Sequence, residues 1–148
     1  MGGRKKMSIC FCANLQQKCL NQELLYQILS EYWSEYQILQ QQEERCIFYK
    51  GMENGIAGIA FIEQKTYPYS IYISDILGKE YHIAQSILFL IDKMQYSIDT
   101  YQKIIDFCIF LKSKINSNLL LTSDVHNEIC FLHKNGILWA ENSFLKNE

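Results

Sequence analysis

The residues best suited to chemistry gather between positions 124 and 133. Asp124, His126, Glu128, Cys130 and His133 all fall in this ten-residue stretch. Imidazole and thiolate groups are ligands that Zn²⁺ takes, so His126, Cys130 and His133 suggest a metal site. Their spacing matches no closed zinc pattern, and a strand over residues 128–133 sets Cys130 on the opposite face from Ile129, Phe131 and His133. We therefore expect no metal and no cofactor here.

The same stretch also suggests acid–base chemistry. Asp124 could orient His126 while Glu128 assists, because a general base is commonly positioned by a third group. Polar residues at alternate positions are equally typical of a solvent-facing loop that enters a strand. The sequence provides neither a partner nucleophile nor a Gly-rich oxyanion turn beside them. We expect no catalytic residues, and a small hydrolase built on this loop stays an alternative.

Two further motifs lack the spacing that a redox pair or a phosphate loop requires. Cys10 and Cys12 are separated by one residue instead of two and do not begin a predicted helix, which argues against a redox pair. Gly51, Gly55 and Gly58 are followed by no Gly-Lys-Ser/Thr, and no helix begins at Gly58, which argues against a phosphate loop. A chain of 148 residues with an apolar core needs no disulfide framework, so the six cysteines are expected to be reduced thiols.

Three helices are predicted from apolar residues at three- and four-residue steps. The first follows the capping residue Asn21 and carries a stripe at Leu25, Ile28, Leu29, Tyr32, Tyr36 and Leu39. The second covers about residues 79–95, and the third follows Ser97 to about residue 115. On the first helix, Glu31 and Glu35 lie beside several aromatic residues and suggest an acidic, aromatic docking face.

Strands are predicted in two blocks on either side of the second and third helices. Residues 45–50, 56–62 and 69–74 form an antiparallel meander, and Gly58 suggests a bulge or a close neighbour. Residues 119–122, 128–133 and 137–141 form the second block, where Asn135-Gly136 is a strong hairpin signal. Blocks of strands favour an α+β fold, with a largely antiparallel sheet of about five to six strands and three helices packed on it. We expect one domain over residues 8–148 after a basic tail, residues 1–7.

The charge pattern excludes several partners. The net charge is −2, and three of the basic residues, Arg4, Lys5 and Lys6, lie in the tail. The remaining acidic body is a poor binder of nucleic acid, whose affinity for proteins comes from Lys and Arg. The longest apolar run, residues 87–91, is far shorter than the roughly 20 residues that span a bilayer, and no signal peptide is evident. We expect a cytoplasmic protein that binds neither nucleic acid nor membrane.

The last third of the chain resembles a known class. Leu119–Thr122 as a strand, the polar Ser123-Asp124 loop and two strands around Lys134-Asn135-Gly136 look like the ending of small bacterial immunity proteins of contact-dependent inhibition and related polymorphic toxin systems. The size, the mild acidity and the preference for Ile over Val and Lys over Arg are also similar to that class. The resemblance implies a non-catalytic cytoplasmic protein that binds and neutralises a cognate toxin domain, usually a nuclease. It implies no site residues.

The candidate contact residues come from the acidic loop and the first helix. Glu31, Glu35, Asp124, His126 and Glu128 are predicted to bind the toxin domain, since acidic side chains attract a basic nuclease surface. An accessory or structural subunit of a larger complex is the second hypothesis. The sequence does not indicate an oligomeric state.

Overall fold

The computed structural model describes residues 8–33, 39–43, 46–50, 56–63, 70–125 and 127–140. Its elements in chain order are β1 (Ser8–Leu15), α1 (Gln22–Tyr32), β2 (Leu39–Glu43), β3 (Cys46–Lys50), β4 (Ile56–Glu63), β5 (Ser70–Ser74), β6 (Lys79–Ile83), β7 (Gln85–Asp92), the 3-10 helix η1 (Lys93–Gln95), α2 (Ile98–Lys114), β8 (Leu119–Ser123), β9 (Asn127–His133) and β10 (Gly136–Trp139).

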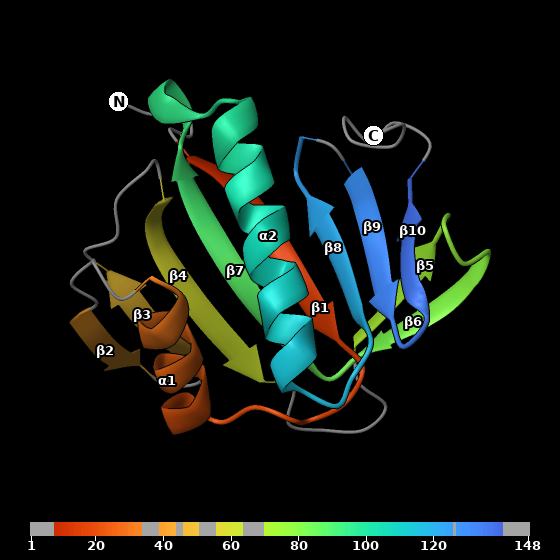
Figure 1. Ribbon diagram of the computed structural model, residues 1–148, viewed down its shortest axis with the longest axis horizontal. Coiled ribbons are helices and arrows are strands. Elements are labelled where there is room, and N and C mark those ends of the chain that lie inside the picture. The colour runs from red at the N-terminus through yellow and green to blue at the C-terminus, as the bar shows by residue number, and fades with distance from the viewer. Residues whose placement is uncertain are drawn as a thin grey trace.

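Eight of the described strands form one antiparallel sheet in the order β10-β9-β8-β1-β7-β4-β3-β2. The first strand of the chain therefore lies in the middle, between β7 and β8. Both α-helices lie on one face of this sheet, while β5 and β6 form a separate hairpin behind β8, β9 and β10 (Figure 1). The α+β prediction with an antiparallel sheet is confirmed, and the main sheet is larger than predicted.

The main core fills the space between the helices and the sheet. Alternate residues of β1 face the helices, because side chains of a strand point to opposite faces in turn, and Phe11, Ala13 and Leu15 are all buried there. Phe107 of α2 joins the layers, since its ring stacks on Trp33 at 4.7 Å and meets the edge of Phe89 at 5.7 Å. Burial of such large side chains supplies most of the favourable free energy of folding.

A second, smaller core lies on the other face of the sheet. Tyr81 and Ile83 of β6 pack there against Leu120 of β8 and Phe131 of β9. The β5–β6 hairpin thus covers β8 and β9 from behind. Strands buried on both faces read as continuous apolar runs, which explains the run of three leucines at 119–121.

The predicted helix over residues 79–95 is wrong, since this segment is β6, β7 and η1. Strand β7 pairs with β1 on one side and β4 on the other. Ile87, Phe89 and Ile91 face the helices and are fully buried, whereas Leu88 and Leu90 point to the opposite face and are half-buried. Because apolar residues occupy both faces of β7, its sequence lacks the apolar–polar alternation typical of a strand and also matches helical spacing.

The two other predicted helices are confirmed at their beginnings. The Asn21 side chain accepts a hydrogen bond from the Leu24 amide at 2.8 Å, and Ser97 caps α2 in the same way. The apolar stripe of the first helix was predicted to reach Leu39, but Leu39 belongs to β2; residues 34–38 lie outside the described residues. The described residues thus contain two α-helices in place of the predicted three.

The strands also differ from the predicted meander. Strands β3 and β4 pair as expected, and the register shift between Ile56 and Gly58 confirms the bulge. Strand β5 does not continue this meander, because it pairs with β6 in the separate hairpin. Over the ranges that the structure describes, neither helix has the length and apolarity needed to cross a membrane. The basic tail, residues 1–7, lies outside these ranges.

Candidate functional site

Asp124 lies at the end of β8 and extends its pairing with β1. Its amide donates to the Cys10 carbonyl at 3.1 Å, and the Cys10 amide donates to Asp124 Oδ1, also at 3.1 Å. This pair follows the last register position of the ladder, Phe11 opposite Ser123. The side chain of Asp124 is exposed. The predicted contact residue is therefore held at a fixed place on the surface, beside the beginning of β1.

Glu128 is placed differently, because it is buried, with 6% of its surface exposed. Its two oxygens accept hydrogen bonds from the amides of Asp75 at 2.9 Å and Ile76 at 2.8 Å, in the turn between β5 and β6. Burial, with the nearby Glu128 carboxylate as a further cause, raises the pKa of Tyr72 to about 12. Contact between Glu128 and a partner stays a prediction, but within the protein the Glu128 carboxylate links the β5–β6 hairpin to β9.

A bulge in β9 determines on which face of the sheet the following side chains of this strand lie. Leu121 pairs with Cys130 while the next residue, Thr122, pairs with Glu128, so Ile129 is the extra residue. Ile129 and Cys130 consequently share the main core, and the prediction that they face opposite ways is wrong. Cys130 and Phe131 do lie in different cores, as alternation predicts. Among the described residues no group of His, Cys, Asp and Glu is arranged to hold a metal ion.

Glu31 lies far from Asp124. It forms a solvent-exposed ion pair with Lys114 at 3.5 Å, at the C-terminal ends of α1 and α2. Helix α2 has 17 residues and so spans about 25 Å, and β8 runs back along it before reaching Asp124 (Figure 1). The structure therefore does not bring these two acidic residues together. Glu35 and His126 lie outside the described residues.

The end of the sheet at which Asp124 lies carries further side chains that are exposed or, for Asp92, half-buried. We name Asp92, Met94, Ile98, Asp99, Asp124 and Val125 the acidic end. The register of β1 places Ser8 opposite Asp92, two residues from the Cys10–Asp124 pair. Phe11 lies 6.0 Å from the ring of Tyr96 and 6.1 Å from that of Tyr101, which brings the first turn of α2 over this part of β1. Segments from β7, α2 and β8 thus meet at one end of the molecule.

The acidic end combines apolar and charged surface. Met94, Ile98 and Val125 are 79%, 52% and 53% exposed. Asp92 accepts a hydrogen bond from the Met94 amide at 3.0 Å, and Asp99 lies in the first turn of α2, where a carboxylate is favoured by the helix dipole. Lys93 adds one positive charge. Exposed apolar residues with a charged rim are typical of protein interfaces.

Sequence reasoning missed five of these six residues. Met94 falls in the helix predicted over residues 79–95, whose apolar residues are expected in the core. Ile98 and Asp99 lie in the first turn of the helix correctly predicted after Ser97, but neither is predicted as a contact residue. The sequence does contain one signal, because Asp92 and Asp99 lie on either side of the capping residue Ser97. Such residues mark the ends of secondary-structure elements, which lie at the surface.

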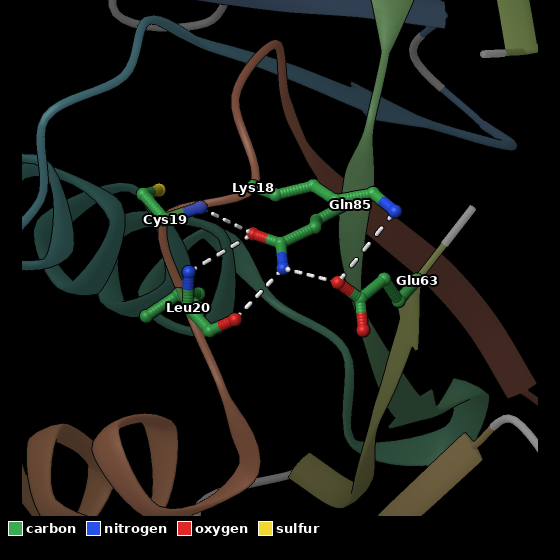
Figure 2. A network of polar contacts seen from close by, with 5 residues as sticks. All are labelled: Lys18, Cys19, Leu20, Glu63 and Gln85. Carbon is green, nitrogen blue, oxygen red and sulfur yellow. Dashed lines mark hydrogen bonds and ion pairs between the residues drawn. The ribbon is translucent and has the colours of Figure 1, made fainter. Parts of the chain in front are cut away.

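A second polar cluster, at the opposite end of β1, holds the chain between β1 and α1. Gln85 is fully buried, and its side-chain oxygen accepts hydrogen bonds from the amides of Cys19 at 3.0 Å and Leu20 at 3.1 Å. Its nitrogen donates to the Leu20 carbonyl at 2.8 Å and to Glu63 at 3.4 Å (Figure 2). Lys18 lies 4.0 Å from the same Glu63 oxygen. Every polar atom of Gln85 is thus used internally, which makes this cluster structural.

The described cysteines are thiols, as predicted, and burial suppresses the ionisation of Cys12, Cys108 and Cys130. Burial raises the pKa of Cys12 and of Cys130 to about 12, and that of Cys108 well above its ordinary value. The thiolate is the reactive form of cysteine, so these groups are poor nucleophiles at neutral pH. Cys46 lies in β3, and its side chain is outside the described part of the structure.

The buried thiols predict an alkaline loss of stability. Above about pH 9 the unfolded chain releases protons from Cys108 and Cys130 while the folded chain retains them, so the free energy of unfolding falls as pH rises, by up to about 1.4 kcal/mol per pH unit for each group. Urea unfolding under reducing conditions between about pH 7.5 and 10 measures this slope. The variant Cys130→Ala should show a shallower slope. An equal slope in both proteins would contradict the assignment.

Comparison with known proteins gives no further constraint, because no protein-family model, curated protein or solved structure matches this chain.

Proposed function

We propose that this chain is a non-catalytic immunity protein that binds and neutralises a cognate bacterial toxin domain in the cytoplasm. The observation that carries the proposal is the acidic end, where three exposed apolar side chains lie among three carboxylates. The resemblance of the last third of the chain to such proteins supports it. Asp124, predicted as a contact, is part of this surface, whereas Glu31 lies at the other end of α2.

The chemistry of the acidic end fits a basic partner. A nuclease needs a positively charged surface for its phosphate substrate, and carboxylates facing that surface accelerate association. Met94, Ile98 and Val125 then supply apolar area that is withdrawn from water when the complex forms. Electrostatic attraction thus raises the rate of association, while burial of apolar surface lowers the rate of dissociation.

The first experiment is to purify the tagged protein from its own cells and identify what co-purifies. A single stoichiometric partner with a basic C-terminal domain supports the proposal. Several subunits of one assembly would instead favour the accessory-subunit hypothesis. Deletion of residues 2–6 removes three positive charges from a chain proposed to bind a basic partner and is expected to speed association with that partner.

Substitutions at the acidic end test where the partner binds. The double variant Met94→Lys/Val125→Lys replaces exposed apolar contact with repulsive charge and is expected to weaken binding at least about tenfold. Ile109→Lys is the matched control, since Ile109 is also an exposed apolar residue but lies in the second half of α2. Isothermal titration with the co-purified domain measures both. Equal loss in the two variants, or none in either, would remove the acidic end from consideration.

A further inference from the structure

A cleft lies behind the sheet, between the β5–β6 hairpin and the β9–β10 hairpin. Its volume is about 320 Å³, within the range of small-molecule sites. Leu77 and Lys79 line it from one hairpin, and Phe131, His133 and Leu138 line it from the other. Asn118 and Gln16 also line it, and the side-chain nitrogen Nδ2 of Asn118 donates to Gln16 Oε1 at 3.0 Å. The cleft is distinct from the acidic end and shares no residue with it.

One wall of the cleft is largely apolar, although Phe131 is only 7% exposed and contributes little of its surface. The rings of Phe131 and His133 stack with 5.5 Å between their centres and 16° between their planes. Leu138 lies beside Phe131 in the β9–β10 register and is half exposed. Leu77 faces them from the hairpin turn. The accessible part of this wall, His133 and Leu138, offers a ring and an aliphatic side chain, which favour contact with an aromatic group.

The polar groups of the cleft favour negative charge. Lys79 shares the sheet-facing side of β6 with Tyr81, whereas Glu80 lies on the other side, 3.6 Å from His82. The Nδ1 atom of His133 accepts a hydrogen bond from the Asn135 amide at 3.3 Å, so the proton of the neutral ring is on Nε2, which can donate. None of the described lining residues is acidic. Among these described lining residues, the cleft of an acidic chain thus presents one ammonium group and no carboxylate.

We propose that this cleft binds a small aromatic carboxylate. The ring lies against Phe131, His133 and Leu138, while the carboxylate pairs with the Lys79 ammonium and accepts a hydrogen bond from His133. The proposal goes beyond toxin binding and is independent of it, because it concerns a different surface and a different class of ligand.

Benzoate is the probe for the test. Titration into ¹⁵N-labelled protein is expected to give saturable shifts of the amide signals of Leu77, Asn118 and Leu138, with a millimolar dissociation constant. Benzyl alcohol keeps the ring without the charge, and cyclohexanecarboxylate keeps the charge without the flat ring. Both should bind more weakly than benzoate. No saturation of these three signals below about 20 mM benzoate would overturn the proposal, and so would equal binding of all three probes.

Variants locate the anion. Lys79→Gln is expected to weaken benzoate binding about tenfold, since a charged hydrogen bond is lost. Lys134→Gln is the matched control, because Lys134 is exposed in the neighbouring β9–β10 turn and does not line the cleft. Both lysines are exposed, so both variants should keep the dispersed spectrum of the folded protein. Equal affinities in the two variants would place the anion elsewhere and overturn the assignment.

Discussion

Replacement of Gln85 by Ala is expected to lower the free energy of unfolding by about 3–5 kcal/mol. The side chain is fully buried and satisfies two amides and one carbonyl of the segment between β1 and α1 (Figure 2). Ala leaves these backbone groups buried without partners, and each such group costs about 1–3 kcal/mol. The cavity left by the side chain adds to the loss. Equilibrium unfolding in urea measures the change.

Two further variants test whether the loss of stability comes from the hydrogen bonds of Gln85 and not from the removal of any glutamine side chain. Gln27→Ala removes an exposed glutamine of α1 and is expected to change stability by less than about 0.5 kcal/mol. Gln85→Glu can still accept from Cys19 and Leu20 but cannot donate to the Leu20 carbonyl, and it places a second carboxylate beside Glu63. It should be destabilised as well, and more at neutral than at acidic pH. A loss in Gln85→Ala no larger than that in Gln27→Ala would show that water replaces the network.

The elements predicted correctly from the sequence are those whose signals are local. Asn21 and Ser97 cap helices because their side chains accept from an amide three residues on, a contact that no distant residue decides. The hairpin around Asn135-Gly136 is equally local: Gly136 has φ +138°, a conformation that favours glycine. Burial of one helix face against a sheet then yields the α+β class from periodicity alone.

The error at residues 79–95 shows where local signals end. Nothing near Ile87 in the sequence indicates that β1 and β4 lie on either side of it, some 75 and 25 residues away. Gln85 gave no signal either, because its partners Cys19 and Leu20 come from a segment 65 residues earlier. A buried glutamine in an apolar run could have been noticed as a conflict with a helix interior, since such a group needs dedicated partners.

The candidate site divides in the same way. Asp124 was correctly expected on the surface because a polar loop after a strand is a local pattern. Glu128, four residues later, matched the same pattern, but its place depends on the hairpin turn at Asp75 and Ile76 and on the bulge at Ile129. Both are non-local features. Residues of the acidic end come from β7, η1, α2 and the turn after β8, so their proximity requires the sheet order and could not be predicted.

Replacement of Glu128 by Gln is expected to lower stability by about 1.5–3 kcal/mol and to loosen the β5–β6 hairpin. Each carboxylate oxygen accepts one backbone amide, whereas a glutamine offers one oxygen and turns an NH₂ group toward the other amide. Hydrogen exchange should therefore accelerate at Asp75 and Ile76 before it does in the main core. Asp124→Asn is the matched control, since it changes an exposed carboxylate that accepts a single amide, and should cost less than about 1 kcal/mol.

The same pair of variants decides whether Glu128 also contacts the partner. If the role of Glu128 is internal, Glu128→Gln weakens partner binding only because the β5–β6 hairpin loosens. A stabilising ligand or a lower temperature that restores slow hydrogen exchange in the hairpin should then also restore partner binding. Weakened binding with unchanged exchange at Asp75 and Ile76 would contradict the internal role and make Glu128 a contact. Asp124→Asn should behave in the opposite manner, because its side chain is exposed at the acidic end: slower association with a basic partner, and little change in hydrogen exchange elsewhere.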